Sequence, residues 1–294
     1  MDVVEIYNLI CWIALAVAAA LLIGSVPVYM RAGAKRSDPS FAAALFTVAL
    51  TLSSLAPLAL SGEWRGLAAI DSRKLLLLAD CGALLAGSLL CLFTALTGAD
   101  VTRVFPLMNL RASVLLVLSY FLLGGRLSIL RLCCVMLILL GTVFMESRSE
   151  RGVSLRWIPH TALSLLMLCG AALLYQMYLA DVPESSALTL CAAEASVLLW
   201  IFTLARGKQK TVRGMGVKAW IMFLLAAVSL SLAIICTTLY SRIGDYSWLS
   251  PIQGLSLIAM VVFSRIFLKE KPPGSAVFGM ILVLIGTFAI RMGW

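Results

Sequence analysis

Three ionisable side chains, Arg111, Glu194 and Asp80, stand inside long apolar stretches of the sequence. An ionisable group at such a position costs about 3 kcal/mol or more to bury in hydrocarbon, so it usually contacts a cavity, a partner or a substrate. A guanidinium can hold a carboxylate or a phosphate through two parallel hydrogen bonds, and a carboxylate can exchange a proton. These residues therefore offer anion binding and proton coupling. The alternative is a structural pairing of Arg111 with Glu194 or with a backbone carbonyl.

The segments that must position these residues are strongly apolar. Of the 294 residues, 62% are hydrophobic and 13% are charged, against about 45–50% and about 25% in soluble domains. This composition predicts a multi-pass protein of the cell (inner or plasma) membrane, with the lipid bilayer as its surroundings. The net charge of +9 resides in short Lys and Arg clusters between apolar runs. Such clusters are typical of membrane topology signals, which argues against a nucleic-acid partner.

Charged and turn-forming segments divide the chain into apolar stretches that can cross a bilayer core of about 30 Å as helices. We predict an all-α integral membrane fold of ten transmembrane helices. The predicted spans cover approximately residues 7–30, 40–60, 75–97, 101–123, 128–145, 157–180, 186–205, 218–241, 247–268 and 274–292. The loops between them are too short to form an extramembrane domain.

The two halves of the chain resemble each other. A shift of 145 positions superposes about fifty residues of the second half on the first without a gap. The matched residues are Asp100 and Asp245, Pro106 and Pro251, Ser119 and Ser264, Leu123 and Leu268, and Gly141-Thr142 and Gly286-Thr287. We therefore predict two five-helix repeats, residues 1–147 and 148–294. An odd number of spans per repeat makes the repeats enter the bilayer from opposite sides, an arrangement typical of alternating access.

The prolines of the fourth and ninth predicted spans are hinge candidates. Pro106 and Pro251 each follow an aspartate, Asp100 or Asp245, by six positions. Proline removes a backbone hydrogen bond and kinks a helix, so both positions are expected to bend their spans. A kink that is purely architectural is the alternative.

These features together resemble the drug/metabolite transporter superfamily, and within it the ten-helix EamA type with two repeats. The resemblance rests on the paired prolines, on the charged turn Phe267-Leu268-Lys269-Glu270-Lys271 and on the final helix with Gly-Thr. The first copy has Gly124-Gly125-Arg126 at the turn and lacks its acidic residue. The resemblance covers essentially the whole chain. It implies a central cavity lined by the first, third, fourth, sixth, eighth and ninth spans.

Polar and aromatic residues on the implied cavity spans are the substrate-binding candidates, with packing or interfacial anchoring as the alternative for each. They are Arg111, Asn109, Tyr175, Gln176, Gln253, Ser256 and Trp248. Ser256 is the repeat equivalent of Arg111, so the internal symmetry is broken where a charge stands. Glu194 and Asp80 are the coupling candidates, although the seventh span, which carries Glu194, lies outside the implied lining.

We therefore expect a secondary transporter that moves a small polar metabolite, an amino acid or a related solute, outward by alternating access. The alternatives are a transporter of an organic cation or of a sugar or phosphate-type metabolite, a lipid-carrier flippase, or a membrane subunit without transport activity. The sequence contains no phosphate-binding Gly-rich loop for ATP. His160, the only histidine, has no accompanying nucleophile motif or metal-ligand cluster. We expect no enzyme activity, no metal and no cofactor, and a monomer or a homodimer.

Overall fold

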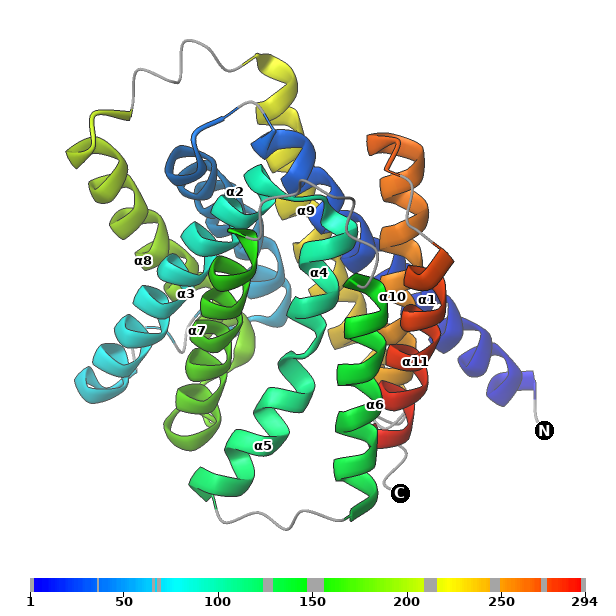
Figure 1. The fold of residues 1–294 in the computed structure, drawn as a ribbon. Helices are drawn as coiled ribbons and strands as arrows, with labels where there is room; N and C mark the ends of the chain where they lie inside the picture. Colours follow the sequence, from blue (N-terminus) through cyan, green and yellow to red (C-terminus); the bar gives the residue numbers. More distant parts are fainter. Residues whose placement is uncertain are drawn as a thin grey trace. The chain divides into compact units, whose positions relative to one another are not determined.

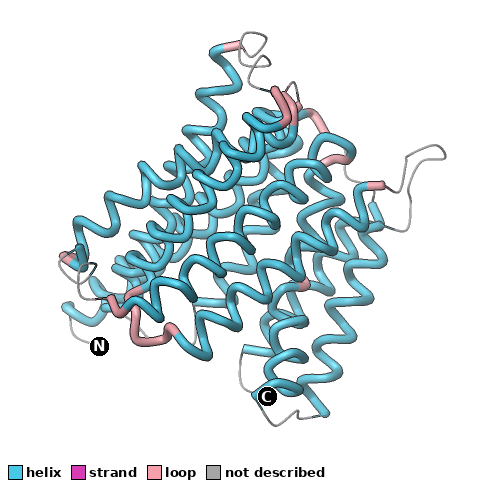
Figure 2. The backbone as a smooth tube through the Cα atoms, turned by 90° about the vertical axis from the view of Figure 1, so that its left-hand side faces the viewer, coloured by secondary structure: helices cyan, strands magenta, loops and turns pink. Residues whose placement is uncertain are grey.

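The chain folds into helices throughout the part that the structure describes. This computed structural model describes residues 3–35, 37–64, 67, 70–123, 129–146, 156–208, 216–243, 249–270 and 274–291, and no strand occurs among them. Figures 1 and 2 show the helices and their connections. The elements are α1 (Val3–Ala34), α2 (Pro39–Ser61), α3 (Ser72–Gly98), α4 (Val101–Asn109), α5 (Arg111–Leu123), α6 (Ile129–Glu146), α7 (Trp157–Tyr178), α8 (Glu184–Ala205), α9 (Val217–Ile243), α10 (Leu249–Phe263), a π-helical turn (Ser264–Leu268) and α11 (Gly274–Arg291).

The described helices confirm a multi-pass membrane protein. Seven segments are long and apolar enough to cross a bilayer: Ile10–Ala34, Pro39–Ser61, Ser72–Gly98, Val101–Leu122, Trp157–Tyr178, Glu184–Ala205 and Val217–Thr237. Shorter apolar helices stand where the fifth, ninth and tenth spans are predicted, at Leu132–Gly141, Leu255–Leu268 and Val277–Gly286. The total of ten spans stays a prediction.

The helices gather into two compact units, each of which draws on both halves of the sequence. Unit 1 contains Met1–Val28, Ala112–Val153 and Leu232–Trp294, and unit 2 contains Tyr29–Arg111 and Ser154–Ser231. The predicted boundary between the sequence repeats, at residues 147 and 148, lies outside the described residues. Helices from both sequence repeats therefore complete each unit.

Helix boundaries recur with the period found in the sequence. α3 and α9 begin at Ser72 and Val217 and end at Gly98 and Ile243, both pairs 145 positions apart. α6 and α11 begin at Ile129 and Gly274 and end at Glu146 and Arg291, again 145 positions apart. Equivalent sequences thus form equivalent helices.

In unit 1, α6 packs on its own repeat equivalent, α11, through a reciprocal glycine contact. A Cβ on Gly141 would lie 2.9 Å from Val283 Cγ2, and a Cβ on Gly286 would lie 2.6 Å from Ile138 Cγ1. Gly141 and Gly286 are equivalent positions, as are Ile138 and Val283. Gly141 follows Ile138 by three positions on α6, whereas its contact Val283 precedes Gly286 by three positions on α11. The order of the contacts is thus reversed between the two helices, which run antiparallel (Figure 1). A reciprocal contact between antiparallel equivalents requires a two-fold axis perpendicular to the helices, so the repeat is inverted.

In unit 2, α2 and α8 are related in the same way. The Thr189 hydroxyl of α8 donates a hydrogen bond to the carbonyl of Ser54 near the end of α2, over 3.3 Å. Phe41 near the start of α2 packs edge-on against Trp200 near the end of α8, with ring centroids 5.8 Å apart. These contacts run in opposite directions along the two helices, which are therefore antiparallel.

The core of unit 2 surrounds α3. The ring of Phe93, which is fully buried, packs against Phe46 and Phe223 with centroids 5.8 and 5.7 Å away. On the α7 side, Ser88 Oγ donates a hydrogen bond of 3.0 Å to the carbonyl of Ser164. These contacts join α3 to α2, α7 and α9 within one unit.

Asp38 caps α2 and ties it to the segment after α8. Its carboxylate accepts hydrogen bonds from the Ser40 backbone N–H over 3.1 Å and from Lys208 Nζ over 3.1 Å. Partial burial raises the pKa of Asp38, but the hydrogen bonds from Ser40 and Lys208 outweigh burial and leave this pKa below its ordinary value.

Replacing Asp38 with Ala is expected to lower the free energy of unfolding by about 1 kcal/mol, the usual value of a lost N-cap. Because the folded-state pKa of Asp38 is lowered, the stabilisation is complete above its ordinary pKa of 3.8 and is lost as the pH falls through the lowered value. Thermal unfolding of the detergent-purified protein measures the change. Asp38→Asn is the control, since it keeps a capping oxygen but removes the charge opposite Lys208. An Asp38→Ala variant as stable as the parent would refute the capping role.

Candidate functional site

The fourth predicted span is broken in its middle. α4 ends at Asn109 and α5 begins at Arg111. Pro106 lacks the N–H that would bond the carbonyl of Thr102. The helix is interrupted four residues later at Leu110, whose N–H bonds the Leu107 carbonyl over 3.1 Å. The break divides one membrane-crossing segment into two helices.

The second copy has no such break at the equivalent place. α10 runs without interruption from Leu249 to Phe263. Pro251 stands in its first turn, where a helix does not need a backbone donor. The interruption therefore belongs to the first copy alone, and the hinge role predicted for Pro106 and Pro251 stays a prediction.

Arg111 is the first residue of the helix that follows the break. It is exposed, and within the described part of the chain no ion pair joins it to Glu194. Ser113 in the same turn is only 2% exposed, and its hydroxyl has no hydrogen-bond partner among the described residues. The first N–H groups of a helix carry a partial positive charge and bind anions. The Arg111 guanidinium therefore stands at the positive end of α5, and the buried Ser113 hydroxyl lies on another side of the same turn.

The residue at the break differs from its equivalent in the other copy, although both residues contact a neighbouring helix through their backbone carbonyls. In unit 2, Cys169 Sγ of α7 lies 3.9 Å from the carbonyl of Arg111. In unit 1 the equivalent positions are Gly24 and Ser256, and a Cβ on Gly24 would lie 2.6 Å from the Ser256 carbonyl. The backbone contact is therefore shared, but Ser256 is half-buried in a continuous helix. The two copies therefore differ in the side chain, arginine against serine, and in the backbone, an interrupted helix against a continuous one.

Asp80 and Glu194 come together in unit 2. They belong to α3 and α8, which pack together in this unit. Glu194 is half-buried and Asp80 is exposed. The Glu194 carboxylate occupies the space beside Gly82, since a Cβ there would lie 2.6 Å from Glu194 Oε2. The sequence predicts two separate coupling candidates, and the structure makes them neighbours.

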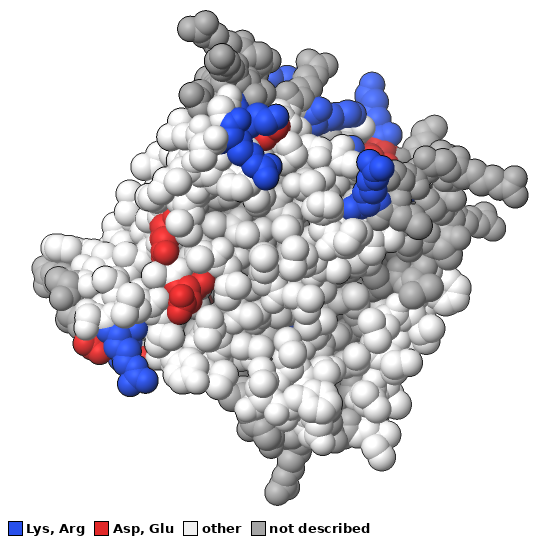
Figure 3. Space-filling view, turned by 60° about the vertical axis from the view of Figure 1, so that its left-hand side comes forward, with Lys and Arg blue, Asp and Glu red and all other residues white. Residues whose placement is uncertain are grey.

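The surface charges are distributed as expected for a membrane protein. On the face shown in Figure 3, Lys and Arg gather in clusters, and the broad area between the clusters is mostly uncharged but contains a few acidic side chains.

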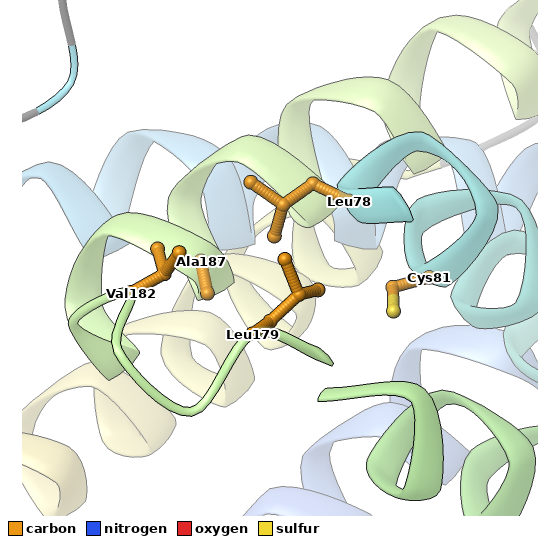
Figure 4. Packing of buried hydrophobic residues seen from close by; sticks show 5 residues of the cluster. All are labelled: Leu78, Cys81, Leu179, Val182 and Ala187. Atoms are coloured by element: carbon orange, nitrogen blue, oxygen red, sulfur yellow. The ribbon is translucent and has the colours of Figure 1, made fainter. Parts of the chain in front are cut away.

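Tyr175 has a structural partner. Its hydroxyl donates a hydrogen bond of 2.6 Å to the carbonyl of Val182, which closes the turn between α7 and α8. Tyr175 packs beside the buried cluster of Leu78, Cys81, Leu179, Val182 and Ala187. Figure 4 shows the five side chains of this cluster. Its predicted contact with substrate stays a prediction.

The remaining substrate-binding candidates are placed only in part. Gln176 is exposed on α7. Asn109, in α4, and Gln253, in α10, have side chains outside the described set, and Trp248 lies outside the described residues. No candidate on α10 is thus brought into a described contact with Arg111.

Sequence reasoning missed a polar group at the end of unit 2 where α3 and α8 begin. Lys74 and Asp181 form an ion pair there, and this hydrogen bond from Lys74 holds the pKa of Asp181 below its ordinary value. A cavity of about 270 Å³ opens beside the pair. The charges stand at span ends, where the sequence pattern alone indicates only solvent contact.

The only histidine of the sequence bonds within its own helix. His160 Nδ1 lies 2.8 Å from the carbonyl of Arg156, the N-cap residue of α7, and His160 is half-buried. Among the described residues no group of His, Cys, Asp and Glu side chains could hold a metal ion.

Comparison with known proteins gives a family match over both halves. The model of the EamA-like transporter family matches residues 10–147 and again residues 155–292. No curated protein matches the chain. Chains of solved structures do match, 22 in number. One of them, described only as the crystal structure of a protein, is 16% identical, covers 94% of each chain and superposes with a TM-score of 0.65. At that identity the likeness shows a shared fold.

Proposed function

Since the chain belongs to the EamA-like transporter family, and is therefore a membrane transporter of the drug/metabolite superfamily, we propose that it is a secondary transporter of a small zwitterionic or anionic metabolite. An amino acid or a related solute is the substrate class, and export across the cell membrane is the direction. The inverted repeat supports alternating access, because the two copies can exchange the inward and outward conformations of one site.

The observation that carries this proposal is the helix break directly before Arg111 in a membrane-crossing segment. A broken helix presents the positive end of its second half inside the span, which is how transporters neutralise an anionic substrate group. The Arg111 guanidinium adds a full charge and can hold a carboxylate with two hydrogen bonds.

The same arrangement disfavours two of the alternatives. An organic cation would meet the Arg111 charge and the positive helix end without a counter-charge on that turn. A neutral sugar would leave the guanidinium without a partner, at the cost of an unsatisfied charged donor. A phosphate-type metabolite and the headgroup of a lipid carrier share the anionic chemistry and are distinguished below.

Arg111→Ala is expected to reduce solute flux into proteoliposomes at least about tenfold, because a lost charge-assisted hydrogen bond contributes about 1.5–3 kcal/mol. A screen of ligand-induced thermal stabilisation with amino acids, sugars, phosphates, nucleosides and quaternary amines first identifies the solute, since a bound ligand raises the apparent stability by mass action. Arg206→Ala is the matched control. Arg206 is an exposed arginine that stacks on Phe202 at the end of α8, and its loss is expected to leave flux unchanged.

Each outcome of this experiment tests the role of Arg111 or the class of substrate. Full flux in Arg111→Ala removes Arg111 from the site and refutes the proposed anion recognition. Movement of labelled lipid in place of solute indicates a flippase, and no flux of either kind indicates a subunit without transport activity. Retention of activity by Arg111→Lys would show that charge alone suffices and that bidentate geometry is not needed.

A further inference from the structure

The polar cavity beside Lys74 lies in unit 2, away from Arg111. Its lining residues come from the start of α3, the turn after α7 and the start of α8: Ile70, Asp71, Lys74, Asp181, Val182, Pro183 and Ser186. The volume of about 270 Å³ is close to the lower end of known small-molecule pockets, which begin at about 300 Å³. Arg111 contacts α7 at Cys169, more than two helical turns before the turn that lines this cavity.

The cavity contains an ammonium group and a carboxylate whose hydrogen-bonding capacity is only partly satisfied within the described part of the protein. Lys74 Nζ donates a hydrogen bond to Asp181, and an ammonium group has two further N–H donors. Asp71 is the N-cap residue of α3, yet its side chain makes no capping hydrogen bond. Its described partner is the Ser72 hydroxyl at 3.5 Å, the limit of a hydrogen bond. One cation and one carboxylate therefore keep most of their hydrogen-bonding capacity.

Ser186 supplies an independent sign of a binding site. The residue lines the cavity and is only 1% exposed, and its hydroxyl has no hydrogen-bond partner among the described residues. A buried hydroxyl without a partner costs about 1–3 kcal/mol. A polar group that enters the cavity would remove this cost.

At the equivalent place in the other copy of the repeat, aromatic side chains fill the space. The position equivalent to Ser186 is Phe41, which is fully buried. Its ring packs edge-on against Trp200 and Trp220, with centroids 5.8 and 6.4 Å away. Three aromatic rings fill the equivalent region there, whereas a serine leaves the space open beside Lys74.

From these contacts we propose that the cavity binds a small zwitterion that carries a primary ammonium and an anionic group. The anionic group accepts hydrogen bonds from Lys74 Nζ and from the Ser186 hydroxyl, and the ammonium donates to the Asp71 carboxylate. Ile70, Val182 and Pro183 form the apolar wall. A free amino acid has this chemistry, and so does the headgroup of phosphatidylethanolamine. The site does not depend on Arg111, so it stands apart from the transport proposal.

Binding is best measured in the full-length Arg111→Ala variant, which removes the contribution of the proposed transport site. The free probes are L-alanine and O-phosphoethanolamine, followed by isothermal titration calorimetry in detergent. The lipid probe is a nanodisc of phosphatidylcholine with or without phosphatidylethanolamine, followed by the thermal unfolding midpoint. Lys74→Gln is expected to weaken binding at least about tenfold, which corresponds to about 1.4 kcal/mol. Ser186→Phe, which copies Phe41, is expected to abolish it.

Arg73→Gln is the matched control, because Arg73 is the exposed neighbour of Lys74 on α3 and does not line the cavity. It is expected to bind like the parent. Ser186→Ala tests the hydroxyl without filling the space and covers the case in which Ser186→Phe does not fold. Binding of a free probe identifies a solute site, and stabilisation by phosphatidylethanolamine alone identifies a lipid site. No binding of any probe, or binding that Lys74→Gln and Ser186→Ala leave unchanged, overturns the proposal.

Discussion

Glutamine at position 194 is expected to abolish the response of transport to an imposed pH gradient while leaving substrate exchange intact. Glu194 is half-buried beside α3, the helix that carries Asp80, and in a membrane-crossing helix an unpaired charge is costly, so uptake of a proton by this carboxylate would remove that cost. Gain and loss of that proton would couple the pair to the gradient. Glutamine has nearly the same shape and keeps the contact with Gly82, but it cannot release a proton.

The measurement compares two fluxes in proteoliposomes. Uptake driven by a pH gradient is expected to fall at least about tenfold in Glu194→Gln, a change of about 1.4 kcal/mol, and exchange of labelled for unlabelled substrate is expected to persist. Asp80→Asn is expected to shift the pH dependence without removing it, because Asp80 is the more exposed partner. Glu63→Gln is the matched control. The Glu63 carboxylate bonds Ser185 outside the pair. A pH response that survives in Glu194→Gln would exclude the pair from coupling.

Alanine at Gly141 is expected to be among the most destabilising single changes in unit 1. A Cβ at this position would lie 2.6 Å from the carbonyl oxygen of Gly279 in the backbone of α11, and Val283 is also within 3 Å. A helix backbone cannot move aside as a side chain can, so α6 and α11 must separate. Overpacking of this kind costs about 1–3 kcal/mol. The thermal unfolding midpoint and the yield of monodisperse protein measure the effect.

Gly286, the equivalent glycine, is expected to respond differently. Its nearest neighbour would be Ile138 Cγ1 at 2.6 Å, which is part of a side chain. The carbonyl of Cys134 would lie 3.0 Å away, so Ile138→Ala is expected to relieve Gly286→Ala in part and Gly141→Ala not at all. Gly274→Ala is the control on α11, since nothing lies within 4 Å of its Cβ position. Equal tolerance of alanine at Gly141 and Gly274 would contradict the close crossing.

Much of the fold follows from the sequence because membrane-crossing helices are defined locally. A run of apolar residues must form a helix in lipid to satisfy its own backbone, so the predicted segment 218–241 and the observed α9, Val217–Ile243, nearly coincide. The repeat follows from the same pattern. The two compact units do not, because they depend on which helix of one copy packs on which helix of the other. That choice is made by small residues such as Gly24 and Gly141, whose partners are distant in sequence.

The candidate site could be predicted only in part. Arg111 and Pro106 are conspicuous in sequence because a charge and a proline interrupt an apolar run, but the break at Leu110 depends on how α4 packs. The neighbourhood of Asp80 and Glu194 joins α3 to α8, and no periodicity within either helix contains that information. The Lys74 cavity was missed because an ion pair between a span end and a distant turn, at Asp181, has no local pattern.

The pairing of α1 with α10 has a consequence for how the protein is made. Gly24 packs against Ala259, which leaves the ribosome 235 residues later. At about 5–20 residues per second, the first helix waits roughly 10–50 s in the membrane before its partner is synthesised. During that time its small-residue surface faces lipid or a membrane chaperone, and unit 1 cannot close until translation is nearly complete.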